Sequence, residues 1–466
     1  MPPNVVWIMT DQHRRDCVGA YSDRPVATPH LDRLAGRSVV FDRHYSTCPL
    51  CVPARSSLHT GRYPHSCGAI INGFGAQGDV TASTLDPGEI TIGELMAQGG
   101  YHVGHVGVDH VRSDPPMATK KAFAQFTNAR QYRQYLSERD LELPDMRPHQ
   151  HECPTRFGKE IRPHFFSAPN PGRHPFAPED FQDVFFAREA SRFIMQAPEE
   201  QPFFLMCFFW MPHPPFVIPE PYLSMYSPDA VKLPPNVPGT QEGKPRMHRE
   251  HLPGQVGAGK SQQEWRAAWA AYYGCVTLVD ECIGQVLDAL HQRGAQDETV
   301  VVFHPDHGEM LGAHEYFQKM VCYEEAIHLP MMVSRPGVTP GRRHCLTSHV
   351  DIAPTILQCA GLGLPDAMQG TSLCGVLDDP AHPHPGAVFS EYNGNVVPDL
   401  YQRCIVSGRH KYIWNQGDTE ELYDLQEDPY EEHNIVDAGG RQADRAQLRA
   451  ALREWMAQTD DFLTLD

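Results

Sequence analysis

Two short apolar runs stand out along this chain, and each is followed at once by a polar turn that contains acids. Residues 5–9 (VVWIM) and 300–303 (VVVF) show no polar alternation, which indicates strands buried on both faces of a sheet. The turns that follow them carry Asp11 and Asp306. Sites in open α/β sheets form beyond the carboxyl ends of the strands. We therefore expect these two turns to meet in space although they lie far apart in the sequence.

Helical patterns alternate with the strand-like runs. Residues 265–292 predict one long helix with an apolar stripe, and residues 448–456 carry the apolar face of a final helix. This alternation predicts an α/β fold, with a large, mainly parallel (mixed) sheet sandwiched by helices. A shift in composition at 376–387 predicts a boundary. We expect a main domain of residues 1–376 and a smaller C-terminal α+β subdomain of residues 377–466, with an antiparallel sheet and a helix.

Two long segments have weak periodicity and many prolines. Residues 113–182 and 234–259 are expected to be insertions near the mouth of a site rather than core. No run approaches the ~18 to 20 apolar residues that span a bilayer. The N-terminus has neither a basic segment nor a cleavage site, so we expect a cytoplasmic protein without membrane contact.

The charge of the chain limits its partners. There are 39 Lys and Arg residues against 58 Asp and Glu residues, which gives a net charge of −19. Such an acidic protein repels nucleic acid, so an anionic ligand would need a local cationic cluster or a metal. The apolar residues at 462–465 could pack on a second copy, so a homo-oligomer is one expectation.

The most informative segment runs from Cys51 to Arg62 and has the pattern C-x-P-x-R-x5-G-R. A cysteine before a proline is by itself an ordinary loop residue. The full string resembles the maturation motif of the sulfatase family, in which the cysteine is oxidised to Cα-formylglycine. The resemblance continues in order through most of the chain, at TPHLDRL (28–34), YG (273–274), DHGEMLG (306–312), DIAPT (351–355) and ELYDL (421–425).

The resemblance implies a fold and a reaction. Sulfatases belong to the alkaline phosphatase-like superfamily, whose members transfer sulfuryl or phosphoryl groups at a metal. We therefore expect a sulfuric ester hydrolase that cleaves a small-molecule sulfate ester. The resemblance also implies one partner protein, a maturase that generates the formylglycine.

The resemblance further implies one divalent cation. Asp11 and Gln12 follow the first strand, Asp306 and His307 follow the later one, and the side chain derived from Cys51 completes the expected ligand set. Three ligands with oxygen donors favour Ca²⁺. The glutamine and a histidine nitrogen keep Mn²⁺ open as the alternative.

Other residues match catalytic positions of the family. Arg55 lies four residues after Cys51, one helical turn away, and would face the nucleophile. Lys319 matches the lysine that contacts the sulfate oxygens. His213 resembles the histidine near the leaving-group oxygen, where an imidazole can act as a general acid. His110 matches the histidine that assists regeneration of the aldehyde.

One departure from the family pattern keeps a second function open. Val108 stands where the family has a lysine, so one sulfate-binding cation is missing, and Pro305 stands where relatives often have Ser or Thr. Phosphonate monoester hydrolases also lack that lysine and place an asparagine after the Gly-Arg segment, as Asn72 does here. The alternative is a phosphonate monoester or phosphodiester hydrolase with promiscuous sulfatase activity. A pseudoenzyme that only binds anions is disfavoured, because every expected metal position is filled.

Overall fold

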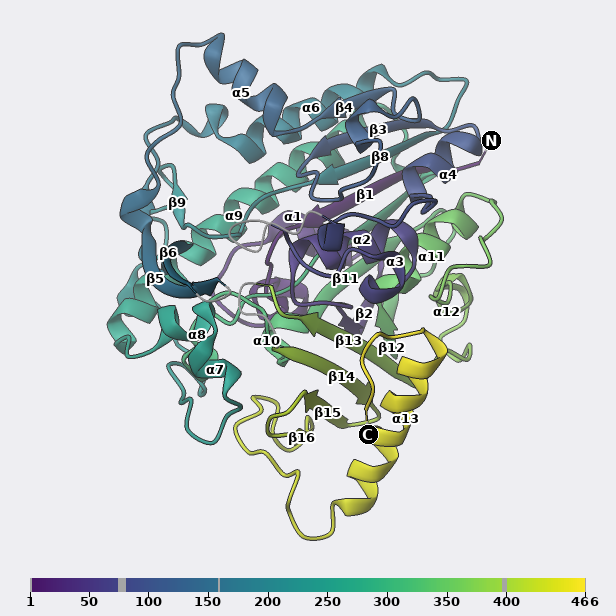
Figure 1. The fold of residues 1–466 in the computed structure, drawn as a ribbon. Helices are drawn as coiled ribbons and strands as arrows, with labels where there is room; N and C mark the ends of the chain where they lie inside the picture. Colours follow the sequence, from purple (N-terminus) through teal and green to yellow (C-terminus); the bar gives the residue numbers. More distant parts are fainter. Residues whose placement is uncertain (1, 74–80, 158–159, 396–399, 466) are drawn as a thin grey trace.

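A single mixed sheet of eight strands forms the centre of the protein (Figure 1). The computed structural model describes residues 2–73, 81–157, 160–395 and 400–465. Within this part of the chain the strand order is β12-β2-β11-β10-β1-β8-β3-β4, and β11 alone runs antiparallel to its neighbours. The strands are β1 (Asn4–Thr10), β2 (Val39–Tyr45), β3 (His102–Gly107), β4 (Gln125–Thr127), β8 (Phe203–Phe208), β10 (Thr299–Pro305), β11 (His328–Ser334) and β12 (Gly341–Ser348).

Helices cover both faces of this sheet. The helices of one face are α1 (Pro29–Ala35), α6 (Gln182–Gln196) and α9 (Gln262–Gln292), and those of the other are α2 (Cys51–Thr60), α4 (Ile92–Gln98), α11 (Ile352–Cys359) and α12 (Cys374–Asp378). Along β1, Val6 and Ile8 pack into the first layer, while Val5, Trp7 and Met9 pack into the second. A strand buried on both sides has no polar face, which explains the uninterrupted apolar run.

The long helix α9 confirms the prediction from periodicity and begins three residues earlier than predicted. Ser261 accepts a hydrogen bond from the backbone N–H of Glu264, and the Glu264 side chain accepts one from the backbone of Ser261. This capping box satisfies two N–H groups that the first turn of a helix would otherwise leave without partners. The start of the helix is therefore set by its cap and not by the apolar stripe.

The C-terminal part forms a separate antiparallel sheet with one helix, as expected (Figure 1). Its helix, α13 (Gln442–Gln458), buries Leu448, Leu452, Trp455 and Met456, the face predicted from the sequence. The four strands are β13 (Ala387–Asn393), β14 (Tyr401–Ser407), β15 (His410–Asn415) and β16 (Glu421–Asp424). The boundary at residues 376 and 377 stays our proposal.

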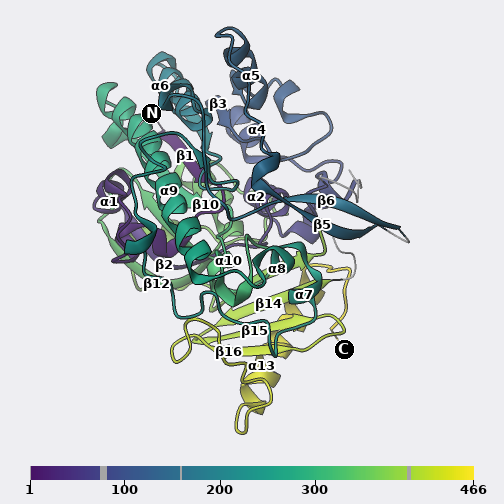
Figure 2. The same ribbon diagram turned by 90° about the vertical axis from the view of Figure 1, so that its left-hand side faces the viewer.

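The segment 113–182 contributes more to the core than its composition suggested. Its short strand β4 forms the edge of the main sheet, and Tyr132 and Leu136 of α5 (Ala129–Ser137) are buried. A strand of three residues is too short to show a period, which is why the sequence did not reveal it. The same segment also forms a hairpin, β5 (Gln150–Phe157) and β6 (Glu160–Ser167), that projects from the body (Figure 2).

The second long segment, 234–259, holds two short helices and lies against the segment that leads to Lys319. These helices are α7 (Met247–Glu250) and α8 (Leu252–Gly257). The backbone N–H of Phe317 donates to the carbonyl of Pro253 at 3.1 Å. Among the described residues, none of the helices is both long and apolar enough to cross a membrane. The remaining elements are α3 (Pro64–Cys67), α10 (Glu324–Ile327) and the paired strands β7 (Gly172–Arg173) and β9 (Val217–Ile218).

Candidate active site

Five strand ends bring the predicted site residues to one edge of the main sheet. Asp11 follows β1, Asp306 follows β10, and Cys51 begins the helix after β2. His110 follows β3, and His213 follows β8. Because these strands run in the same direction, their carboxyl ends share an edge, which is where sites form in open α/β sheets. The topology therefore assembles residues that are separated by up to about 300 positions in the chain.

Four buried side chains converge at the centre of this edge. Asp11, Cys51, Asp306 and His307 each offer one potential ligand atom, and these atoms all lie within 4.8 Å of one another. Nδ1 of His307 lies 3.0 Å from the carbonyl of Gly308, so it carries the proton of the neutral ring. The lone pair of Nε2 is thus left for the centre, where it lies 3.2 Å from Sγ of Cys51. Four of the five predicted metal ligands are brought together.

Arg55 joins the two carboxylates. Its Nη2 donates to Asp11 at 2.8 Å, and its Nε donates to Asp306 at 2.7 Å. The remaining Nη1 donates to the backbone carbonyl of Val108 at 3.2 Å. Helix α2 places Arg55 one turn beyond Cys51, as the sequence predicted.

The two carboxylates have different electrostatic surroundings. Burial, and then repulsion by Asp306, raises the pKa of Asp11 to about 7. Burial acts on Asp306 in the same direction, but interactions with His307, Arg55 and Lys319 hold the pKa of Asp306 below its usual range. One guanidinium thus faces two buried carboxylates. The oxygens of Asp11 and Asp306 and the Nε2 nitrogen of His307 form a donor set that fits a divalent cation.

Lys319 is buried beside this centre with all three of its protons directed at acceptors. Nζ lies 2.9 Å from Nε2 of His213 and 3.2 Å from Sγ of Cys51, and it also donates to the side-chain oxygen of Gln12. The amide nitrogen of Gln12 donates to Glu309. The predicted metal ligand Gln12 therefore lies at the site, where its oxygen contacts Lys319.

The backbone around Lys319 is strained. Gln318 and Met320 on either side have φ angles of 70° and 82°, and Gln12 has 63°, all in the left-handed region that non-glycine residues seldom adopt. Glu309 stabilises this arrangement, because its carboxylate accepts from the backbone N–H of Gln318 and from Gln12. Such strain persists only where the surroundings impose it, and it is concentrated at functional sites. Glu309 was not among the predicted site residues, although it lies within the matched DHGEMLG block.

Both predicted catalytic histidines lie next to Trp210. The ring centre of Trp210 is 4.2 Å from that of His213 and 6.0 Å from that of His110. Burial lowers the pKa of both histidines well below the usual value, so both rings are neutral at neutral pH. Asp183 accepts a hydrogen bond from the backbone N–H of Trp210 at 2.6 Å and fixes the end of β8. Sequence reasoning missed Trp210 and Asp183; the acidic residue on the apolar face of α6 was the available signal.

The chemistry of Cys51 as a thiol argues against a thiolate enzyme. Burial, followed by the charge of Asp11, raises the pKa of the Cys51 thiol to about 12. Catalytic cysteines have a lowered pKa, because the thiolate is the nucleophile. An unmodified Cys51 would stay protonated at neutral pH and would attack an anionic ester poorly.

Comparison with known proteins agrees with this geometry. The model of the family described as "Sulfatase" matches residues 3–362, and that of "N-sulphoglucosamine sulphohydrolase, C-terminal" matches residues 312–458. The chain belongs to the sulfatase family. It is therefore a hydrolase of sulfate esters with an alkaline phosphatase-like fold.

Individual relatives cover nearly the whole sulfatase chain. An ulvan-active sulfatase of Formosa agariphila is 28% identical over 100% of this chain and 83% of its own length. An arylsulfatase of Clostridium perfringens is 27% identical over 94% and 91%. The crystal structure of a phosphonate monoester hydrolase of Agrobacterium radiobacter superposes with a TM-score of 0.82 at 25% identity, over 98% of this chain and 96% of that one.

The two positions that keep the phosphonate alternative open, Val108 and Asn72, lie at the edge of the site. Val108 is buried, and Gly107 before it has a φ of 120°, where a Cβ would lie 1.8 Å from the carbonyl oxygen of Phe208. Only glycine allows this close approach of two strand ends. Asn72 accepts a hydrogen bond at 2.9 Å from the backbone N–H of Val52, in the first turn of α2. Its carbonyl therefore caps the helix that carries Cys51.

Proposed function

We propose that this sulfatase uses a formylglycine made from Cys51 together with one divalent cation. The observation that carries the proposal is the position of Cys51, at the start of a buried helix and within reach of Asp11, Asp306 and His307. The raised pKa of its thiol supports modification over thiolate chemistry. When present, the formylglycine hydrate supplies the nucleophile, and the cation lowers the pKa of that nucleophile and withdraws charge from the ester.

We assign the metal to Asp11, Asp306, His307 and the modified side chain of residue 51. Gln12 would join them if its side-chain oxygen turned from Lys319 to the ion. Carboxylate and amide oxygens favour Ca²⁺, which is our first choice, and the imidazole nitrogen keeps Mn²⁺ as the alternative. The raised pKa of the buried Asp11, whose charged form is disfavoured without a metal, supports this assignment.

The remaining residues bind the ester and move protons. Arg55 and Lys319 provide positive charge on two sides of Cys51, where the non-bridging oxygens of the ester would lie. His213 would protonate the leaving oxygen from Nε2, with Lys319 as the neighbouring proton source at 2.9 Å. We assign to His110 the removal of the proton from the remaining hydroxyl of residue 51, upon which the C–O bond to the sulfate would break, sulfate would leave and the aldehyde would be restored.

The alternative reaction is hydrolysis of a phosphonate monoester or a phosphodiester. Val108 removes a cation from the substrate side, and the phosphonate monoester hydrolase of Agrobacterium radiobacter has a similar fold over the full chain. Asn72 would contact the ester through its amide nitrogen, since its carbonyl is used by the helix cap. Both kinds of substrate carry one negative charge at neutral pH, so charge alone does not separate them.

We also propose a cellular location, partners and the segments that determine substrate choice. We keep the cytoplasm as its location, a formylglycine-generating maturase as its protein partner, and a homo-oligomer as one arrangement. The segments 113–182 and 234–259 are proposed to select the alcohol half of the substrate. In support, Gln318 beside Lys319 donates to the carbonyl of Ser167 at the end of the hairpin.

A substrate panel tests the proposal. Protein produced together with a maturase is assayed for kcat/KM on nitrophenyl sulfate, a nitrophenyl phosphonate monoester and a nitrophenyl phosphodiester, before and after removal of metal. We expect sulfate hydrolysis that is lost with the metal and recovered on adding Ca²⁺ or Mn²⁺. Metal-independent turnover would overturn the proposed mechanism, and a preference for the phosphonate ester would select the alternative.

A further inference from the structure

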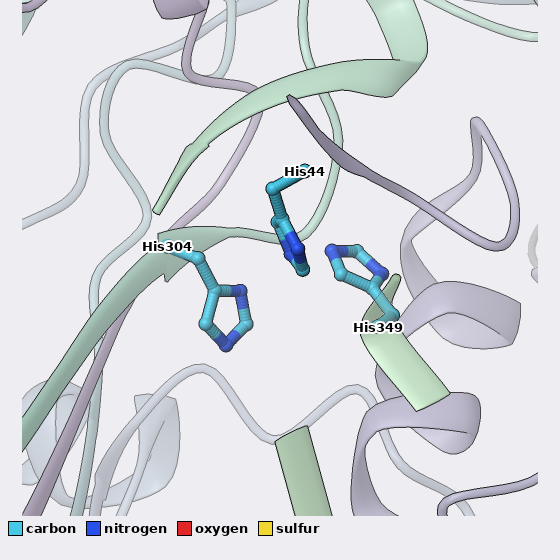
Figure 3. A group of neighbouring side chains, drawn as sticks. All are labelled: His44, His304 and His349. Atoms are coloured by element: carbon cyan, nitrogen blue, oxygen red, sulfur yellow. The ribbon is translucent and has the colours of Figure 1, made fainter. Parts of the chain in front are cut away.

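Three buried histidines lie together (Figure 3), two of them in contact with the residue before Asp306, and the proposed chemistry does not use them. His44 belongs to β2, His304 to β10, and His349 begins the 3₁₀-helix His349–Asp351. Their side chains point toward one another, and one nitrogen of each lies within 4.8 Å of the others. All three are fully buried. Such a group either binds a metal or organises a neighbouring part of the protein.

The hydrogen bonds of His304 determine its tautomer. The indole nitrogen of Trp7 can only donate, and it lies 2.7 Å from Nε2 of His304. Nε2 is therefore an acceptor, and the proton of the neutral ring is on Nδ1. Nδ1 lies 2.9 Å from the carbonyl oxygen of Pro305, to which it donates.

His349 contacts the same carbonyl of Pro305. Its Nε2 lies 3.2 Å from the oxygen of Pro305, so it also donates there. Its Nδ1 lies 3.2 Å from the hydroxyl of Ser46. That hydroxyl is 2.8 Å from the carbonyl of Asp306 and 2.8 Å from the carbonyl of Cys48, three residues before the nucleophile position.

This arrangement disfavours a metal at the three histidines. A metal would need the lone pairs of His304 Nδ1 and His349 Nε2, and both atoms carry protons that the Pro305 carbonyl accepts. His44 differs from the other two: its Nδ1 contacts the Thr347 hydroxyl at 3.1 Å, and its Nε2 is buried without a hydrogen-bond partner among the described residues.

We propose that His304 and His349 are positioning residues for the metal ligand Asp306. By both donating to the carbonyl of Pro305, they fix the backbone one residue before the carboxylate. Ser46, whose single hydroxyl proton can be donated to only one of the three acceptors around it, lies between His349, that turn and the loop that precedes Cys51. The inference rests on the proposed function, because it requires Asp306 to bind the cation. Residues that hold a metal ligand in place commonly change metal affinity when they are replaced.

Calorimetric titration of the metal-free protein with Mn²⁺ tests the proposal without any assay of activity. His349→Phe keeps a ring of similar size but cannot donate, and we expect Mn²⁺ binding to weaken about tenfold or more. His349→Gln retains an amide donor toward Pro305 and should stay within about threefold of the parent. His44→Phe is the matched control, since His44 is equally buried but does not contact Pro305, and its binding should stay within about twofold.

Several outcomes would overturn the proposal. Equal weakening by His44→Phe and His349→Phe would mean that packing alone matters. Equal weakening by His349→Gln and His349→Phe would exclude the hydrogen bond as the cause. Two equivalents of Mn²⁺ in the parent, one of them lost in His44→Phe, would make the three histidines a metal site.

Two further variants complete the test. If His349→Phe does not fold, Ser46→Ala tests the same link, with about threefold weaker binding expected and unchanged binding contradicting the proposal. Asp306→Ala is the reference for the proposed function. Unchanged Mn²⁺ binding in Asp306→Ala would reject the proposed metal site itself, whereas lost binding there with parental binding in His349→Phe would reject this inference alone.

Discussion

Nζ of Lys319 lies 2.9 Å from Nε2 of His213, and the direction of this hydrogen bond is determined by the other side of the ring. Nδ1 of His213 donates to the carbonyl of Pro214, so Nε2 of the neutral ring accepts from the ammonium group. Lys319 is therefore placed both to attract the oxygens of the ester and to supply a proton next to the leaving group.

Replacement of Lys319 by alanine should lower kcat by roughly 10²-fold or more, as expected for loss of one charge that stabilises the transition state. The exposed Lys121 provides a control, since Lys121→Ala removes a positive charge without a contact to Cys51 or His213. Steady-state kinetics on a sulfate ester measure both variants. A loss of less than about threefold in Lys319→Ala would show that Lys319 does not act on the ester.

The same variant should change the pH dependence. Burial, and then the charge of Lys319, lowers the pKa of His213, because a cation disfavours the imidazolium form. Removing Lys319 should therefore raise the pKa of His213 and move the corresponding limb of the kcat profile to higher pH. A limb that stays in place or moves to lower pH would contradict the pairing.

Asp11→Asn should separate stability from metal binding. The pKa of Asp11 is raised from 3.8 to about 7, so its charged form is disfavoured in the folded protein without metal. Between about pH 4 and 7 the carboxyl is ionised in the unfolded chain but costs free energy to ionise in the folded state. In EDTA at pH 7, Asp11→Asn should therefore melt at a higher temperature than the parent, and at pH 3 the difference should vanish.

Added metal should stabilise the parent against heat but should not stabilise Asp11→Asn. Adding Ca²⁺ or Mn²⁺ should raise the Tm of the parent but not that of Asp11→Asn, because only the parent keeps both carboxylates for the ion. Thermal melts with and without metal give both comparisons. Equal metal-induced rises in the two proteins would remove Asp11 from the metal site.

Val108→Lys should favour sulfate over phosphonate esters. Val108 is buried at the edge of the site, and its backbone carbonyl accepts a hydrogen bond from Arg55. A lysine at this position would add the cation that the family pattern has there. Val108→Met is the matched control, because it adds length without charge. The test compares kcat/KM for both esters in all three proteins. A ratio that stays within about twofold of the parent, or ~0.4 kcal/mol, would mean that residue 108 does not face the ester.

Much of the fold could be predicted because its signals are local. The uninterrupted runs of β1 and β10 follow from burial on both faces, and the apolar stripe of α9 follows from its contact with the sheet. The antiparallel strand β11 was not predicted, since HLPMMVS shows an apolar run but not its direction. Direction depends on the pairing with β10 and β2, which are distant in sequence.

The site also has parts that could be predicted from the sequence and parts that could not. Cys51, Arg55 and Asp306 could be expected at one site because the motifs that contain them resemble those of the sulfatase family, and the structure brings these side chains together. Contacts made through backbone carbonyls could not be predicted from the sequence. An example is the carbonyl of Pro305, which both His304 and His349 contact. Carbonyl groups are present at every position and leave no signal in a sequence. The strained conformations beside Lys319 also depend on packing from distant segments.

Conversion of Cys51 to formylglycine is the central claim, and peptide mass spectrometry combined with a rate assay tests it most directly. Preparations made with different amounts of maturase should contain different fractions of formylglycine at residue 51, and kcat for a sulfate ester should rise in proportion to that fraction and extrapolate to zero. Cys51→Ala should show no turnover. Full activity in a preparation that contains only the unmodified thiol at Cys51 would contradict the account.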